Sequence, residues 1–172
     1  MKGRKIKKFV TVLTLVISLI AVQTLEITAM ASTGTPDLSN PDVVVSDMES
    51  FFNAVSTAED GTVIGIDTVI YINAGSYQIG SEAEPKHLYL VRKSGNAGIY
   101  ITNTANLTIY NMTIDGNRNS VSGDCPMFTV NGALNLHYST VQNSDTLGEK
   151  GTIYVADSAS FFSVGTTYTN NC

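Results

Sequence analysis

Met112-Thr113-Ile114-Asp115-Gly116-Asn117 returns twice in this sequence, as Ser139-Thr140-Val141-Gln142-Asn143-Ser144 and as Thr166-Thr167-Tyr168-Thr169-Asn170-Asn171. The three copies follow one another at a constant spacing of 27, and they end a longer unit that is repeated through residues 98–171. Apolar residues recur at this spacing in three columns: Leu107, Leu134 and Phe161; Ile101, Phe128 and Val155; and Ile114, Val141 and Tyr168. A fixed period of about 20 to 50 residues is typical of a solenoid, in which each repeat stacks on the next.

Within one unit, the residue types favour short β-strands joined by fixed turns. Residues 106–109 alternate polar and apolar side chains at the period of a strand, and residues 112–114 do so again. Two columns of turn residues flank this second strand: Asn111, Tyr138 and Gly165 before it, and Gly116, Asn143 and Asn170 after it. Gly and Asn adopt left-handed backbone conformations at little cost, so both columns predict a repeated turn, and only Tyr138 departs from this preference. Such coils would stack by parallel strand pairing at about 4.8 Å.

The residues of these units resemble a known family. The run from Asn106 to Asn117 looks like one rung of the right-handed parallel β-helix, the pectate-lyase-like fold. Residues 151–155 followed by 166–171 are similar to rungs of bacterial surface β-helix and adhesin-like proteins. The resemblance implies an all-β fold, a right-handed parallel β-helix solenoid. An antiparallel sandwich is the alternative, but a sandwich gives no reason for a strict 27-residue register.

Residues 1–31 have the pattern of a secretory signal peptide. Five basic residues precede an apolar run over residues 9–22, which is short for a membrane span, and Ala29-Met30-Ala31 supplies a cleavage site of small residues. An uncleaved N-terminal anchor is the alternative, and Glu26 disfavours it because a carboxylate is costly in hydrocarbon. We therefore expect a secreted or cell-surface protein with no membrane segment after cleavage at Ala31.

A linker and a capping helix are predicted to precede the solenoid. Residues 32–45 have the composition of a polar linker, and residues 46–61 predict a short helix. Ser46 and Glu49 fit a capping box. The helix would carry one apolar stripe: Met48, Phe51, Phe52 and Val55. We expect it to cover the open first coil; the alternative, a helix on a membrane surface, is disfavoured by its acidic polar face.

Residues 62–172 are predicted to form the parallel β-helix. The 27-residue spacing is not clean at its start, because Gly80 stands where an apolar residue would be due. We therefore expect one or two irregular coils over residues 62–96, with a loop around residues 81–85. No polar or helical segment follows the last coil, although natural solenoids cap their ends. The solenoid is thus expected to be incomplete at its C-terminal end: either further coils or a partner would cover that face.

The charge balance excludes one class of partner. The whole chain has a net charge of −5, and removal of residues 1–31 takes away five basic residues and one acidic residue, which leaves −9. An acidic surface without a basic stripe repels phosphates, so we expect no nucleic-acid binding. Polysaccharides and surface proteins remain as candidate partners.

Catalytic side chains would have to come together in the stacked columns, because side chains related by the 27-residue period would nearly touch. Asp115 would stack on Gln142 and Thr169, so no column brings two carboxylates together. The paired-Asp and His-flanked motifs of lyases and galacturonases are also missing from the sequence, so no catalytic residue is predicted and enzymatic activity is left open.

One loop region supplies the candidate binding residues, Arg118, Asp145 and Glu149. Asp145 and Glu149 could chelate calcium weakly, and Arg118 would form a surface ion pair with Asp145 at the 27-residue spacing. No metal site is predicted beyond this candidate calcium ligation, and no other cofactor. His87 and His137 have no further ligand at metal-binding spacing and are expected to be structural. Whether Cys125 pairs with Cys172 is left open, because positions 47 apart do not stack.

These observations predict a structural or adhesive role, with glycans as one candidate ligand. The predicted faces are rich in Thr, Asn, Ser and Tyr, which suit saccharides or partner proteins, although this inference rests on the fold. The alternative is the N-terminal part of a polysaccharide lyase or glycoside hydrolase whose catalytic coils follow Cys172.

Overall fold

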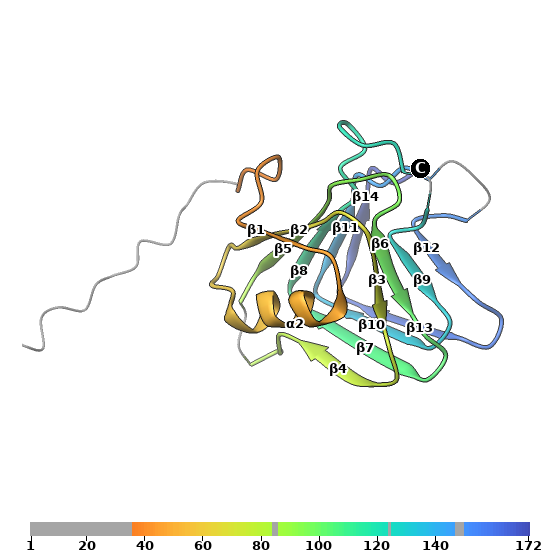
Figure 1. Cartoon of the computed structure of the whole chain (residues 1–172). Helices are drawn as coiled ribbons and strands as arrows, with labels where there is room; N and C mark the ends of the chain where they lie inside the picture. Colours follow the sequence, from red (N-terminus) through yellow and green to blue (C-terminus); the bar gives the residue numbers. More distant parts are fainter. Residues whose placement is uncertain (1–35, 84–85, 124, 147–149) are drawn as a thin grey trace, which may run out of the picture. The chain divides into compact units, whose positions relative to one another are not determined.

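The structure is a computed structural model, and it describes residues 36–172 apart from 84–85, 124 and 147–149 (Figure 1). The predicted signal peptide, residues 1–31, lies outside the described residues. Within the described ranges, no helix has the length and apolar character needed to cross a membrane.

Three parallel sheets wind into a β-solenoid, in which successive coils add one strand to each sheet. Sheet A contains β1 (Val43–Val45), β2 (Val63–Ile66), β5 (Leu88–Arg92), β8 (Met112–Asp115), β11 (Thr140–Gln142) and β14 (Thr167–Thr169); sheet B contains β3 (Val69–Ile72), β6 (Gly98–Ile101), β9 (Phe128–Val130) and β12 (Ile153–Val155); and sheet C contains β4 (Gly75–Ile79), β7 (Ala105–Tyr110), β10 (Ala133–His137) and β13 (Ser160–Val164). The predicted all-β parallel solenoid is confirmed, and it has about four turns.

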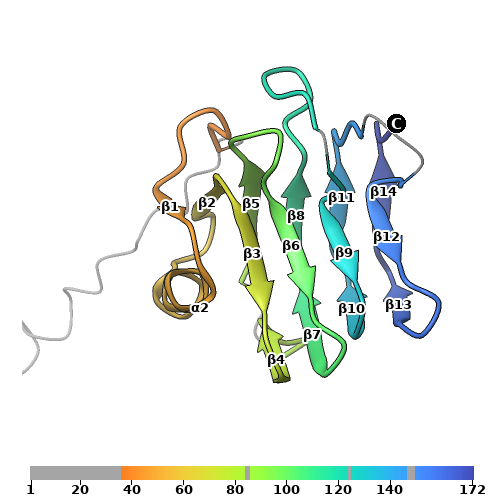
Figure 2. The ribbon, with the colours of Figure 1, turned by 45° about the vertical axis from the view of Figure 1, so that its right-hand side comes forward.

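The helix α2 (Met48–Thr57) lies at the β1 end of the stacked coils, as Figure 2 shows. Its cap differs from the prediction by one residue. Asp47, not Ser46, is the N-cap: its carboxylate accepts a hydrogen bond from the Ser50 backbone nitrogen at 2.7 Å, and the Ser50 hydroxyl accepts one from the Asp47 backbone nitrogen. Phe51 is fully buried against the core, so the capping role of the helix is confirmed.

Residues 43–45 were expected within the linker but form β1, which pairs with β2. Three consecutive valines explain the difference, because β-branched side chains favour extended backbone and fit a pleated surface. Sheet A therefore extends one strand beyond the first three-strand coil.

The 27-residue register holds on sheets A and C in the C-terminal coils. Leu134 pairs with both Leu107 and Phe161, and Val141 pairs with both Ile114 and Tyr168, so two of the predicted columns are confirmed. All column members before the last coil are fully buried.

The predicted column of Ile101, Phe128 and Val155 is wrong. Val130, not Phe128, pairs with Ile101 and with Val155, so the sequence spacing on sheet B is first 29 and then 25. The loop before β9, residues 116–127, is two residues longer than the loop before β12, and the connection after β9 is two residues shorter than the one after β12. These two changes in length cancel over a whole coil. The overall 27-residue period therefore does not reveal the shift of pairing on sheet B.

The first coil is irregular, as predicted. On sheet C its sequence spacing to the next coil is 30, which places Ile79 rather than Gly80 opposite the buried Ile109. Gly80 instead forms the following bend, with a φ of 68°.

The bend between sheets C and A has the same backbone conformation in every coil. Gly80, Asn111, Tyr138 and Gly165 all have positive φ, which confirms the predicted turn column. Tyr138, at φ 50°, adopts a conformation that bulky residues avoid, and its ring lies against Gly165, where an added Cβ would be 2.5 Å away.

The turn after β8 departs from the prediction. Asn143 and Asn170 have positive φ, but in the β8 coil the left-handed residue is Asn117 and not Gly116. Gly116 is needed for space, since a Cβ there would lie 2.4 Å from the Cα atom of Ser144. The left-handed turn therefore begins one residue later in this coil than in the next.

Leu134→Ala should lower the free energy of unfolding by about 2–5 kcal/mol, because it opens a cavity in the middle of a fully buried column. Thr140→Ala, at a half-exposed position on β11, should change it by no more than about 0.5 kcal/mol. Urea unfolding followed by circular dichroism measures both. Equal effects of the two substitutions would contradict the inward assignment of Leu134.

Tyr138→Asn should leave stability unchanged within about 0.5 kcal/mol, because relief of the left-handed strain, about 1 kcal/mol, offsets the lost packing on Gly165. Tyr110→Asn, on the adjacent strand with ordinary backbone, gains no such relief and should cost about 1 kcal/mol or more. Thermal unfolding of the two variants measures the difference. A Tyr138→Asn variant as unstable as Tyr110→Asn would show that the backbone of Tyr138 is not strained.

Candidate functional site

Two of the three predicted binding residues lie on long loops that join sheet A to sheet B. Arg118 is on the loop of residues 116–127 and Asp145 is on the loop that follows β11, whereas Glu149 lies outside the described residues. The Arg118 Nη1 atom donates to the backbone oxygen of Asn170 and contacts the Cys172 Sγ atom, each at 2.9 Å. Arg118 thus ties the last residues of the chain to its loop.

The expected ion pair between Arg118 and Asp145 does not form among the described residues. Because the left-handed turn begins one residue later in this coil, the Arg118 backbone nitrogen donates to the Asn143 oxygen, which moves Arg118 out of line with Asp145. The described residues include no group of three or more His, Cys, Asp and Glu side chains that could hold a metal ion. Calcium binding that involves Glu149 stays a prediction.

Asp115 stacks on Gln142, as predicted, and is almost completely buried with 4% of its surface exposed. Its Oδ1 atom accepts a hydrogen bond from the Asn117 backbone nitrogen at 2.7 Å, and its Oδ2 atom accepts bonds from the Gln142 and Asn143 side-chain amides, each at 2.8 Å. These three donors satisfy the carboxylate. The arrangement therefore fixes the turn after β8.

Both histidines contact other side chains rather than a cluster of metal ligands. The His87 Nε2 atom lies 2.8 Å from the Thr113 Oγ1 atom. Burial lowers the pKa of His87 below its usual value, against the smaller opposing effect of the Asp60 charge, and favours the neutral ring at neutral pH. His137 stacks on Tyr110 with 4.5 Å between ring centroids and 16° between ring planes. The structure does not join Cys125 to Cys172 in a disulfide.

The outer face of sheet C gathers neighbouring aromatic side chains from β7, β10 and β13 and from the bend after β10. Inward positions such as Leu107 and Leu134 are fully buried, so the alternate residues of each strand face outward. We name the outward-facing set the aromatic row: Tyr110, His137, Tyr138 and Phe162. His137 is its centre, with ring centroids 5.8 Å from Phe162 and 6.5 Å from Tyr138.

A ladder of polar side chains runs beside the aromatic row. The Asn135 side-chain amide donates to the Asn106 Oδ1 atom at 3.0 Å and to the Thr108 Oγ1 atom at 3.2 Å. Gln78 and Phe162 continue the column of Thr108 and Asn135 across the sheet. None of the outward positions in β4, β7, β10 and β13 carries Asp, Glu, Lys or Arg. This face therefore presents aromatic rings and amide groups with almost no charge.

Glu82 supplies a carboxylate at one end of the aromatic row. The Tyr138 hydroxyl donates to the Glu82 Oε1 atom at 3.3 Å. The negative charge of Glu82, together with this hydrogen bond, raises the pKa of Tyr138 above its usual value. Tyr138 therefore remains a neutral hydroxyl group at physiological pH.

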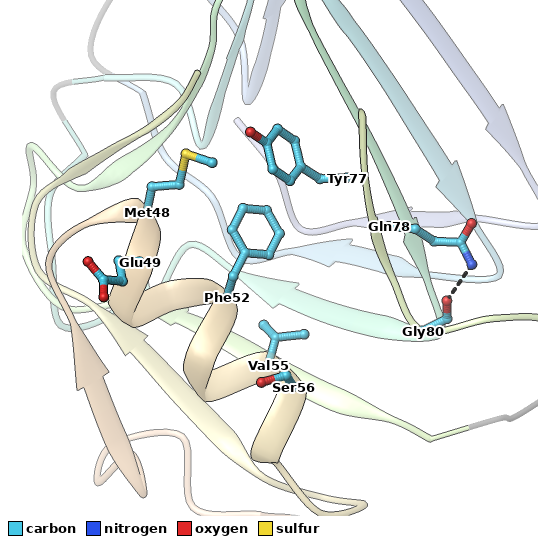
Figure 3. Close-up of a pocket in the computed structure, with 8 residues that line it drawn as sticks. All are labelled: Met48, Glu49, Phe52, Val55, Ser56, Tyr77, Gln78 and Gly80. Carbon is cyan, nitrogen blue, oxygen red and sulfur yellow. Dashed lines mark hydrogen bonds between the residues drawn. The ribbon is translucent and has the colours of Figure 1, made fainter. Parts of the chain in front are cut away.

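A mostly apolar groove of about 720 Å³ lies between α2 and β4 (Figure 3). Its lining residues are Met48, Glu49, Phe52, Val55, Ser56, Tyr77, Gln78 and Gly80. The rings of Phe52 and Tyr77 stack at 4.8 Å, and the Gln78 side chain donates to the Gly80 oxygen at 2.9 Å. Gln78 belongs both to this groove and to the outer face of sheet C, so the two surfaces adjoin.

The sequence did not reveal the groove, because the same apolar stripe is typical of a helix that is completely covered. In the structure only Phe51 of that stripe is fully buried, while Met48, Phe52 and Val55 line the groove. The aromatic row did have a signal. Tyr110, His137 and Val164 share one 27-residue column. They lie an odd number of residues from Leu107, Leu134 and Phe161, so they face the opposite side of the sheet from that apolar column.

Comparison of the chain with protein-family models, curated proteins and solved structures finds no match in any of the three. The chain is classified by its architecture, a parallel β-solenoid with a helix over one end.

Proposed function

We propose that this chain is a secreted or cell-surface adhesive β-solenoid that binds neutral polysaccharides along the outer face of sheet C. One observation carries the proposal: the aromatic row of Tyr110, His137, Tyr138 and Phe162 lies beside the amide ladder of Asn106 and Asn135. The resemblance of the rungs to surface β-helix proteins of the pectate-lyase-like kind agrees with this role.

Saccharides combine apolar C–H faces with a rim of hydroxyl groups. Aromatic rings can stack on the C–H faces, while amide and hydroxyl side chains such as Asn135 and Thr108 exchange hydrogen bonds with the rim. Because the strands pair in register, a polymer lying across the sheet would meet one outward side chain of the same column at each coil. In one column these are the polar groups of Gln78, Thr108 and Asn135, followed by the ring of Phe162.

Charge favours neutral polysaccharides over acidic ones. The outward positions of sheet C carry no basic side chain that could pair with a uronate, and Glu82 lies at the end of the aromatic row. The expected net charge of −9 after signal cleavage would also repel a polyanion. We therefore expect neutral glucans, mannans or xylans to bind more tightly than polygalacturonate.

Affinity electrophoresis and titration calorimetry against these four polysaccharides test the proposal. The native chain should bind at least one neutral polymer, and His137→Ala or Phe162→Ala should weaken binding about tenfold, which corresponds to about 1.4 kcal/mol. Tyr71→Ala is the matched control for Phe162→Ala, because Tyr71 is an aromatic residue on sheet B with similar exposure, and its ring lies tilted against Tyr100. It should leave the affinity unchanged.

Two outcomes would contradict the proposal. The proposal would be refuted if the folded chain bound no neutral polymer. It would also be refuted if Tyr71→Ala lowered the affinity as much as His137→Ala or Phe162→Ala. Reducing ends and unsaturated products, measured with and without calcium, are followed in the same samples. Their appearance would favour a polysaccharide lyase or glycoside hydrolase instead.

A further inference from the structure

The strand β4 has one paired edge and one free edge. It is the end strand of sheet C and, within the part of the chain that the structure describes, it pairs only with β7. The Gly75 backbone nitrogen donates to the Thr104 oxygen, so the backbone groups of Gly75 and Tyr77 point toward β7. Successive residues of a strand direct their N–H and C=O groups to opposite edges. The backbone groups of Ser76 and Gln78 therefore point to the free edge.

The apolar groove between α2 and β4 lies along this free edge (Figure 3). One wall is α2, which contributes the side chains of Met48, Phe52 and Val55. The other wall is β4, which contributes Gln78 and Gly80. The groove therefore places apolar side chains opposite the outer edge of a strand.

A ligand of this groove must satisfy both walls. An alkyl chain would cover the apolar wall, but it would bury the backbone groups of Ser76 and Gln78 without hydrogen-bond partners, which is costly. An extended peptide supplies backbone donors and acceptors to the strand edge and turns every second side chain toward the apolar wall. The two walls together therefore match a β-strand.

Sheet A already contains a strand at the corresponding level. There β1 pairs with β2 and extends sheet A beyond the first coil, whereas sheet C begins at β4. The strand β4 contains no charged residue and no proline, although proteins commonly use such residues to protect an exposed edge. The position beside β4 is thus suited to a further strand.

Charge limits the peptides that fit the groove. Among the eight described residues that line it, Glu49 is the one charged residue. The expected net charge of −9 after signal cleavage adds a general repulsion of acidic segments. The favoured segment is therefore neutral or basic.

We propose that the groove between α2 and β4 binds an extended peptide segment of a partner protein, which adds to sheet C as a strand beside β4. Its backbone exchanges hydrogen bonds with Ser76 and Gln78, and its alternate apolar side chains contact Phe52 and Val55. The added strand extends sheet C as β1 extends sheet A. This inference goes beyond polysaccharide binding and does not depend on it.

Titration calorimetry with a synthetic peptide tests the inference on the native chain. The probe has the sequence of residues 105–110, the strand that pairs with the other edge of β4, and both of its ends are capped. It is uncharged and carries apolar side chains at alternate positions. N-methylation of one alternate set of its amides should weaken binding at least about tenfold, and methylation of the other set by no more than about twofold. Binding by side chains alone would not give this alternation.

A pair of substitutions in β4 tests the backbone contact from the side of the protein. Gln78→Pro removes the N–H at the free edge, and proline is tolerated where the nitrogen of an edge strand faces outward. It should weaken peptide binding at least about tenfold. Gln78→Ala is the matched control, because it removes the same side chain but keeps the N–H, and its effect should stay within about twofold.

A second pair places one added charge on either side of α2. Val55→Asp puts a carboxylate in the apolar groove and should weaken peptide binding at least about tenfold. Asn53→Asp adds the same charge to the same helix, but Asn53 is exposed and lines a separate hollow between α2 and β1. It should leave the affinity unchanged. Circular dichroism confirms that each variant is folded, and if Gln78→Pro does not fold, the methylated peptides and the charge pair decide.

Three results would overturn the inference. The first is no binding of the peptide to the folded native chain at concentrations up to about 1 mM. The second is an equal response to both methylated sets, and the third is an equal loss of affinity in the two members of a substitution pair. Self-association of the native chain that Val55→Asp abolishes would also overturn it and would identify a second copy as the occupant. Polysaccharide is omitted throughout, so none of these results bears on the proposed glycan binding.

Discussion

Parallel pairing between coils is the constraint on which this structure depends. A strand side chain must point inward in every coil of a column, because a shift by one residue would turn the whole apolar set of that strand outward. The chain meets this condition with a fixed left-handed residue at the bend between sheets C and A, and with loops of variable length elsewhere. Sheets A and C therefore keep a strict 27-residue register in the C-terminal coils, while sheet B absorbs the variation.

This division explains which features the sequence could predict. The columns of Leu134 and Val141, the repeated turns and the capping helix follow from local patterns that the fold preserves. The column on sheet B could not be found, because two loop lengths change in opposite directions and leave the period intact. The partner of Arg118 was missed for a related reason. The turn begins at Asn117 instead of Gly116, so the backbone nitrogen of Arg118 donates to the Asn143 oxygen and Arg118 is out of line with Asp145.

The sequence predicts which types of residue form the candidate site, but not where the site lies in the fold. The outward positions of sheet C do not pack in the core, so their residue types are set by contacts at the surface. Asn106, Asn135 and His137 fit that description, and a polar and aromatic face was expected from composition. Its location on sheet C, its nearly uncharged character and the adjoining groove at Phe52 and Tyr77 depend on how strands and helix pack in three dimensions. No local pattern in the sequence contains that information.

Because the helix α2 covers only one end of the described coils, the stability of the coils should differ along the stack. In a stack where each coil contacts only its neighbours, stability is nearly a sum of coil terms and interface terms. Coils beside α2 are covered on both sides, whereas β12, β13 and β14 have a neighbour on one side only. Among the described coils, local opening should therefore begin at the last one and propagate toward the helix, so amide protection should rise from the last coil toward α2. A strand paired with β12, β13 or β14 would raise amide protection in the last coil, as α2 does at the other end of the stack.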